Sequence, residues 1–148
     1  MGLMNIQLRP ITKETVREVC ALEVRDDQKG NVAPNALSIA QAHFEPSAVF
    51  RAVYRGEELI GFIQWRNAEG PRVAFLWRFM IDRAHQSAGY GRAALALTLQ
   101  EMKSSGFEVV ETSVGLGPSS PLKFYLSQGF IEANQTTPSG EWLLIRIL

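Results

Sequence analysis

The sequence has little cysteine and no excess of charge of either sign. Its 148 residues hold a single cysteine, Cys20, which excludes an internal disulfide framework and a thiolate-rich zinc site. Fifteen Lys and Arg residues balance fifteen Asp and Glu residues. This balance argues against nucleic acid as a partner, because proteins that bind it carry a basic excess. No run approaches the roughly 18 apolar residues that span a membrane.

The first residues of the chain also lack the basic start and the long apolar run of a signal peptide. We therefore expect a cytoplasmic protein with no membrane partner. A chain of this length corresponds to one domain. The 46% hydrophobic and 20% charged fractions exclude intrinsic disorder, collagen and a coiled coil. Residues 1–148 are expected to form a single domain with its own core.

The hydrophobic pattern alternates between strands and helices. Alternating or continuous apolar runs predict strands at 6–8, 49–54, 59–65, 73–81, 109–114, 130–133 and 142–147. Helical periodicity predicts helices capped at Thr12 and Asn35, a third over 92–103 and a fourth ending at 128. The order β-α-α-β-β-β-α-β-α-β-β predicts an α/β (α+β) fold, with a mixed central sheet of about seven strands flanked by about four helices. The run 73–81 predicts a central strand covered on both faces.

A glycine-containing loop follows this apolar strand and precedes a long helix. Glycine, here Gly89 and Gly91, lets the backbone approach a ligand closely, and the first N–H groups of a helix attract phosphate. The absence of Gly-Lys-Ser/Thr excludes a P-loop, and Ala94 stands where the dinucleotide-binding fingerprint needs its third glycine. From glycine spacing alone, a plain strand-to-helix turn is the simpler interpretation.

Two motifs resemble those of the GNAT N-acetyltransferases. Residues 86–91, Gln-Ser-Ala-Gly-Tyr-Gly, are similar to the family's Gln-x-x-Gly-x-Gly motif for acetyl-coenzyme A. Residues 124–130, Phe-Tyr-Leu-Ser-Gln-Gly-Phe, resemble its Phe-Tyr-x-x-x-Gly-Phe segment. The resemblance covers nearly the whole chain. Within the family, the segments NVAPNALSIAQAHFEP, FLWRFMID and GYGRAAL resemble the bacterial spermine/spermidine (diamine) acetyltransferase branch.

This resemblance implies a GNAT-like domain with a site for acetyl-coenzyme A. Backbone groups of Phe79, Met80 and Ile81 would face the pantetheine arm, at a local splay of the central strand. Backbone N–H groups of the following loop would cradle the pyrophosphate, from Gln86, Ser87, Ala88, Gly89, Tyr90, Gly91 and Arg92. The chain departs from the family pattern at four positions. Relatives often carry basic residues where this chain has Ala84 and Ala88, glycine where it has Ser87, and asparagine where it has Pro118. These departures could lower the affinity for the cofactor.

Transfer of an acetyl group from a thioester to an amine needs a proton donor for the leaving thiolate. A phenol with a pKa of about 10 can protonate a thiolate whose conjugate acid has a pKa of about 8.5, and the resemblance places Tyr125 beside the thioester sulfur. The alternative for Tyr125 is a packed aromatic on an amphipathic helix. No carboxylate lies within 73–81, so the base that deprotonates the amine is unassigned, and a chain of water molecules is one candidate.

The resemblance makes a polyamine or a similar small primary amine the expected acceptor. Polyamines are cations that bind carboxylates and aromatic faces, and we assign this binding to Glu23, Asp26, Asp27 and Trp77. A solvated charge or a core position is the plainer interpretation of each. Three other functions stay open: a different acceptor (an amino acid, an aminoglycoside or a protein amine), a non-catalytic acyl-coenzyme A-binding regulatory module, and a nucleotide-binding regulatory domain. No metal is expected. The segment WLLIRIL fits either a homodimer interface or an internal strand.

Overall fold

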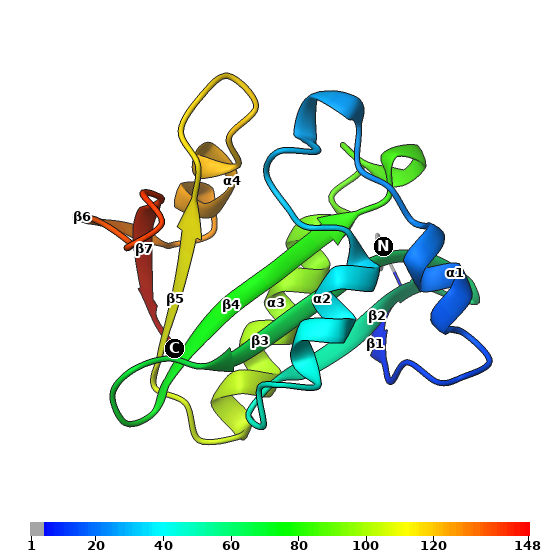
Figure 1. The fold of residues 1–148 in the computed structure, drawn as a ribbon, viewed down its shortest axis with the longest axis horizontal. Helices are drawn as coiled ribbons and strands as arrows, with labels where there is room; N and C mark the ends of the chain where they lie inside the picture. Colours follow the sequence, from blue (N-terminus) through cyan, green and yellow to red (C-terminus); the bar gives the residue numbers. More distant parts are fainter. Residues whose placement is uncertain (1–4) are drawn as a thin grey trace.

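The computed structural model describes residues 5–148, which form one seven-stranded sheet with helices on both faces (Figure 1). The strand order is β1-β2-β3-β4-β5-β7-β6. β4 and β5 run parallel, and the other neighbouring strands run antiparallel. The strands are β1 (Ile6–Arg9), β2 (Val49–Arg55), β3 (Glu58–Asn67), β4 (Val73–Ile81), β5 (Val109–Val114), β6 (Ile131–Thr136) and β7 (Trp142–Ile147).

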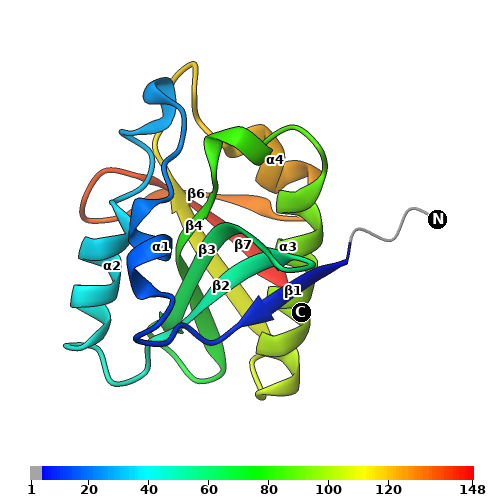
Figure 2. The same ribbon diagram turned by 90° about the vertical axis from the view of Figure 1, so that its right-hand side faces the viewer.

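Four α-helices cover this sheet, two on each face (Figure 2). They are α1 (Val16–Ala21), α2 (Asn35–Ala42), α3 (Tyr90–Ser104) and α4 (Leu122–Ser127), and two short 3-10 turns are η1 (Asp26–Gln28) and η2 (Arg83–His85). The predicted fold class and element order are confirmed. Within the described residues, no helix has the length and apolarity needed to cross a membrane.

The two helical layers bury alternate residues of the same strands. On β2 and β3, Val53 and Ile63 belong to the core beneath α3 and α4, whereas Ala52 and Phe62 belong to the core beneath α1 and α2. Burying a Val, Ile or Phe side chain contributes about 1.5–3 kcal/mol, so the alternation of the pleat holds both layers against the sheet.

Two predicted helix caps differ from the structure. α1 begins at Val16, and its N-cap is Thr15. The Val16 N–H donates to the Thr12 carbonyl, so Thr12 belongs to the turn that precedes the helix. Asn35 is the first residue of α2, after Pro34, and its side-chain amide donates a 2.9 Å hydrogen bond to the Val19 carbonyl. Because Asn35 is buried, its amide satisfies a carbonyl of the neighbouring helix instead of capping its own.

β4 is central in the sheet, but only its C-terminal end, at Met80 and Ile81, is buried on both faces. Ala74 and Leu76 are buried in the core, whereas Phe75 and Trp77 are only half-buried. The guanidinium of Arg66 lies 4.7 Å from the centroid of the Phe75 ring and 5.2 Å from that of Trp77. A cation on a neighbouring strand therefore covers aromatic surface that we expected to lie beneath a helix.

β4 departs from a regular strand along both of its edges. It pairs with β5 only over 73–76, where it faces 109–112, and beyond this point the two strands diverge (Figure 1). On its other edge, the register with β3 shifts: Gln64 faces Arg78, while Trp65 faces Leu76. Trp77 is thus the extra residue of a β-bulge. The predicted splay of the central strand is present, and β7 is an internal strand between β5 and β6.

Candidate active site

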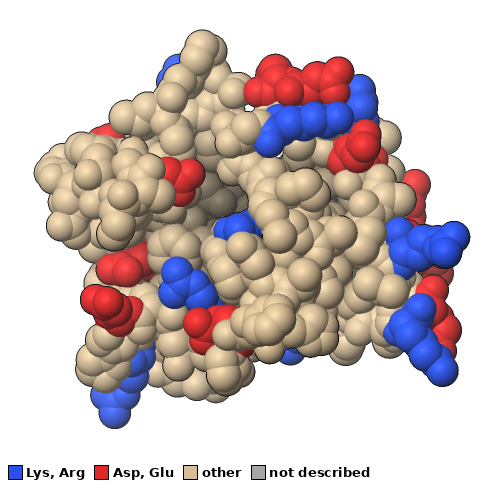
Figure 3. Space-filling model, viewed as in Figure 1, with Lys and Arg blue, Asp and Glu red and all other residues tan. Residues whose placement is uncertain are grey.

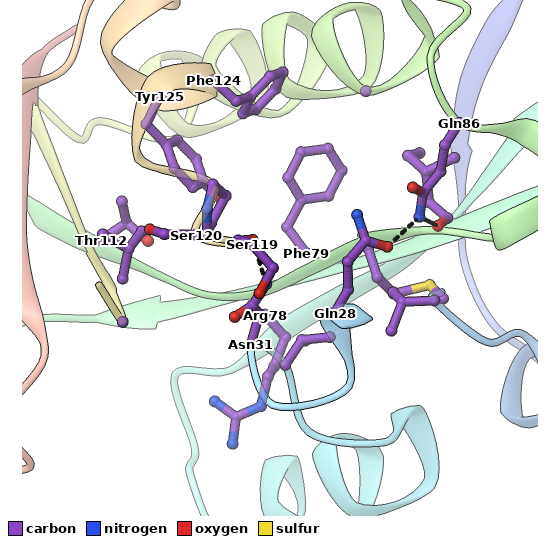
Figure 4. Close-up of a pocket in the computed structure, with 18 of the residues that line it drawn as sticks. Gln28, Asn31, Arg78, Phe79, Gln86, Thr112, Ser119, Ser120, Phe124 and Tyr125 are labelled. Carbon is purple, nitrogen blue, oxygen red and sulfur yellow. Dashed lines mark hydrogen bonds between the residues drawn. The ribbon is translucent and has the colours of Figure 1, made fainter. Parts of the chain in front are cut away.

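The divergence of β4 and β5 opens a cleft with a volume of about 680 Å³. Figure 3 shows the hollow between the β4 and β5 sides of the molecule, with both basic and acidic side chains on its rim. Its walls come from β4, from the loop before α3, from the segment around η1, and from the stretch between β5 and α4. Segments distant in the sequence therefore meet at one cavity (Figure 4).

Most of the residues predicted to bind the cofactor line this cleft. They are Phe79, Met80, Ile81, Gln86, Ser87, Gly89, Gly91 and Arg92. Ala88 and Tyr90 belong to the same loop but are not among the described lining residues. The Tyr90 ring instead packs against the guanidinium of Arg55, at 5.1 Å.

The loop before α3 has an unusual backbone. Gly89, the N-cap of α3, has φ +85°, and Ser87 has φ +65°. Both values lie in the left-handed region, which glycine adopts freely and serine adopts at a cost of roughly 1–2 kcal/mol. The turn brings the free N–H groups of the first turn of α3 to the cleft, beside the cationic Arg92. These groups suit an anionic ligand such as a pyrophosphate.

The side chain of Gln86 ties this loop to two other walls. Its amide nitrogen donates to the Ile81 carbonyl at 2.8 Å and to the side-chain oxygen of Gln28 at 2.9 Å (Figure 4). The side chain of Gln86 is therefore a structural clamp between β4 and η1. Any contact of Gln86 with a phosphate must come from its backbone.

Tyr125 lies on α4, in the wall of the cleft opposite β4. Only 7% of it is exposed, and its ring packs edge-on against Phe124 and Phe130, with centroids 5.3 and 5.2 Å apart. In Figure 4 the ring points from α4 toward Thr112 on β5. Burial raises the pKa of the Tyr125 phenol well above its usual range, and the Thr112 side chain offsets part of that rise. The phenol thus keeps its proton at neutral pH, as a proton donor must.

The four residues predicted to bind the acceptor are divided between the cleft and its surroundings. Asp27 and Trp77 line the cleft, whereas Glu23 and Asp26 are not among its described lining residues. Lys29 lies 3.9 Å from the Glu23 carboxylate and 3.2 Å from that of Asp26. Both carboxylates also face Arg83, at 3.6 and 4.0 Å. Two of the predicted acidic residues are thus engaged with cations at the surface.

The two predicted residues that do line the cleft also have cationic neighbours. Arg25 lies 3.3 Å from the Asp27 carboxylate. The Trp77 ring has the guanidinium of Arg66 at 5.2 Å and that of Arg78 at 5.1 Å.

Within residues 5–148, no three His, Cys, Asp or Glu side chains are grouped to hold a metal.

Several polar residues of the cleft could not be identified from sequence patterns. Asn31, in the loop after η1, donates a 2.7 Å hydrogen bond to the Ser119 carbonyl before α4, and so bridges two walls of the cleft (Figure 4). Gln28 accepts the hydrogen bond from Gln86. Arg78 lies within the apolar run 73–81, and a lone cation in such a run is the one signal that could have identified it.

The sequence and the fold of the chain are both similar to those of known acetyltransferases. Residues 12–130 match the model of the acetyltransferase (GNAT) family, while the curated proteins give no match. Among solved structures, the GNAT domain of PAT from S. lividans has a TM-score of 0.77 at 20% identity, covering 97% of this chain and 90% of that chain. The PaiA N-acetyltransferase from Thermoplasma acidophilum, in complex with coenzyme A, has a TM-score of 0.73 at 18% identity, covering 98% and 100%. A variant of the spermidine N-acetyltransferase from Vibrio cholerae has a TM-score of 0.75 at 16% identity, covering 97% of this chain and 94% of that chain. At these identities the likeness establishes the fold.

Proposed function

The chain belongs to the GNAT family of acetyltransferases, and from this premise we propose that its cleft transfers an acetyl group directly to a small primary amine. The protein is an acetyl-coenzyme A-dependent N-acetyltransferase. One observation carries the assignment of the site: a single cleft, at the divergence of β4 and β5, joins the N-terminus of α3 to the buried phenol of Tyr125.

The residues of the cleft fit acetyl-coenzyme A. Beyond Leu76, the edge of β4 that faces β5 has no strand partner. Apart from the Ile81 carbonyl, which accepts from Gln86, the peptide groups of Phe79, Met80 and Ile81 on that edge could pair with the amides of a pantetheine arm, as an added strand would. The loop over 86–92 then offers backbone N–H groups and Arg92 to the pyrophosphate. Eight of the ten positions that the sequence resemblance implies line the cleft, and Ala88 and Tyr90 are the other two.

Acetyl-coenzyme A would supply an activated acyl group: the neutral amine nitrogen bonds to the thioester carbonyl carbon, the carbon–sulfur bond breaks, and the products are an amide and the free thiol. An amine that arrives as an ammonium group first releases one further proton to solvent. In this proposal Tyr125 gives its phenolic proton to the sulfur and regains one from the amine through solvent. Burial raises the pKa of Tyr125, which weakens it as an acid, but burial also raises the pKa of a thiol in the cleft, which offsets that effect on the transfer. Free N–H groups on the unpaired edge of β4 suit the carbonyl oxygen as negative charge develops.

The acceptor that the sequence resemblance favours is a polyamine. A spermidine N-acetyltransferase is among the similar structures, and Asp27 is a carboxylate in the cleft wall that could meet a polyamine ammonium group. A second class of acceptor, an amine that carries a carboxylate, is favoured by the charge of Arg78.

A thiol-release assay with acetyl-coenzyme A tests this function. The acceptor panel comprises spermidine, spermine, putrescine, lysine, an aminoglycoside and a peptide, and calorimetry measures coenzyme A binding in parallel. Saturable turnover with at least one amine supports catalysis, and turnover with the polyamines alone supports the polyamine assignment. Binding of coenzyme A without turnover across the panel would favour a non-catalytic module, and nucleotide binding that acetyl-coenzyme A does not displace would favour a nucleotide-binding domain.

A further inference from the structure

Arg78 places a half-buried cation in the wall of the cleft. Its Nη1 donates to the Trp77 carbonyl at 3.0 Å and its Nη2 to the side-chain oxygen of Gln41 at 3.0 Å. Its Nε is buried and has no hydrogen-bond partner. A guanidinium has five N–H donors, so more than half of the donors of Arg78 are free.

The charge of Arg78 also lacks a contacting anion among the described residues. The carboxylate of Glu141 acts on Arg78 from a distance, but one of its oxygens accepts a 2.7 Å hydrogen bond from the Ser113 hydroxyl. Arg66 adds a like charge nearby, and burial lowers the pKa of Arg78. A desolvated cation with free donors is costly unless an anion binds it.

Arg78 lies on the face of β4 opposite to Phe79 and the aromatic cluster of α4. Arg78 and Phe79 are consecutive residues, and their side chains point to opposite faces of the strand (Figure 4). Phe79 points toward the aromatic cluster of α4, with its ring centroid 6.2 Å from that of Phe124. Arg78 points toward α2, where Gln41 accepts from it. Because Tyr125 and the N-terminus of α3, which are assigned to the cofactor, lie on the Phe79 side of the sheet, we place the acceptor on the opposite face, which carries Arg78.

We infer that Arg78 binds a carboxylate of the acceptor, so that the preferred acceptor is an amino acid or another primary amine that bears a carboxylate. This inference rests on the proposed function and leaves its chemistry unchanged. The planar edge of a guanidinium matches the two oxygens of a carboxylate, and Nη1 and Nη2 of Arg78 each donate only one hydrogen bond to the protein, so each keeps one N–H for such a partner. A polyamine would instead bring further positive charge toward Arg78 and Arg66.

Matched pairs of amines, with and without a carboxylate, test this inference. The pairs are lysine with cadaverine, ornithine with putrescine, and phenylalanine with phenethylamine, measured by thiol release at saturating acetyl-coenzyme A. We expect kcat/KM to favour the carboxylate member of at least one pair by tenfold or more. Arg78→Gln should lower kcat/KM for that member about 100-fold, because a site built for a polar group loses most of its discrimination without its donor. It should change kcat/KM for the decarboxylated partner less than threefold.

Two further variants separate recognition from folding. Arg78→Lys keeps the charge without the planar edge, and should retain part of the preference. Arg51→Gln is the matched control: Arg51 is also half-buried and also lies over a tryptophan, with its guanidinium 5.8 Å from the Trp65 ring, but it pairs with Glu101 away from the cleft. It should leave the ratio within each pair unchanged. Calorimetric binding of coenzyme A by Arg78→Gln confirms that the variant is folded.

The inference is overturned if the decarboxylated amines or spermidine have the higher kcat/KM, or if Arg78→Gln lowers kcat/KM equally for both members of a pair. Absence of turnover with every amine would instead contradict the proposed function. In that case, calorimetry with phenylalanine and coenzyme A-loaded protein decides about Arg78: binding that is lost in Arg78→Gln supports a carboxylate site, and absence of binding by the parent protein rejects it.

Discussion

The side-chain amide of Asn31 donates a 2.7 Å hydrogen bond to the backbone carbonyl of Ser119, across 88 positions of the sequence. The bond joins the loop after η1 to the segment before α4, and these are two walls of the cleft. A second bridge, from Gln86 to Gln28, holds the other side of the η1 segment. The shape of the cleft therefore depends on polar contacts between loops, in addition to the packing of the core.

Removing the Asn31 bridge should weaken substrate binding more than it slows the chemical step. Asn31→Ala loses one exposed hydrogen bond, worth about 1 kcal/mol, and lets the two walls separate. We expect the KM for the acceptor to rise about 3- to 10-fold, with kcat changed less, in steady-state thiol-release kinetics. Asn31→Asp, which cannot donate to the carbonyl, should behave like Asn31→Ala. An unchanged KM in both variants would contradict a role for the bridge.

Tyr125→Phe should abolish most turnover and leave binding intact. The phenylalanine ring keeps the edge-on contacts with Phe124 and Phe130 but has no proton for the thiolate. General acid catalysis is worth about 10²- to 10⁴-fold, so we expect kcat to fall by at least 100-fold. The Kd of coenzyme A should stay within about twofold by calorimetry. Phe124→Leu, on the same helix, is the control for packing and should lose far less turnover. A kcat within threefold of the parent would reject the acid role of Tyr125.

Burial of the Tyr125 phenol should make the protein sensitive to alkali. Because its pKa is raised in the folded state, an unfolded chain loses this proton at a lower pH than the folded protein. Below about pH 10 both states are neutral and the phenol has no effect on stability. Above that pH the unfolded state is favoured, by about 1.4 kcal/mol at pH 11. Urea unfolding at pH 9 and pH 11 should show this loss in the parent protein and a correspondingly smaller loss in Tyr125→Phe.

Ser87→Gly should tighten cofactor binding. Serine at φ +65° holds a conformation that costs it roughly 1–2 kcal/mol, whereas glycine adopts it freely. Part of this gain is offset by the greater freedom of glycine in the unbound loop, so we expect the Kd of coenzyme A to fall about two- to fivefold by calorimetry. Ala88→Gly is the matched control one residue on: Ala88 has no positive φ, and the same substitution there should weaken binding or leave it unchanged. Equal effects at both positions would contradict the argument from backbone strain.

The sequence was sufficient for the order of the strands and helices, because periodicity and turn residues are local signals. It also led to Tyr125 and to the loop over 86–92, through motif spacing. It did not reveal how charges pair. Glu23 and Asp26 looked available for a cationic acceptor, but both face Arg83. Four elements, α2, β2, β3 and β4, separate Arg83 from them along the chain, so no local pattern reveals this pairing. The Asn31 bridge and the free donors of Arg78 likewise exist only once distant segments meet.

The β-bulge at Trp77 determines whether the odd- or the even-numbered side chains of β4 point toward the α3 side of the sheet. Before it, the even-numbered Ala74 and Leu76 face the α3 side; after it, the odd-numbered Phe79 and Ile81 do. A regular strand would bring Arg78 to that core and Phe79 to the acceptor side. The one extra residue thus reverses the face to which each following side chain of β4 points. It thereby determines which side chains form the core and which ones face the acceptor. Deleting Trp77 would remove the extra residue and leave both sets on their present faces, whereas absorbing Trp77 into a regular strand would exchange them. The specificity of this cleft therefore depends on the register of β4 as well as on side-chain identity.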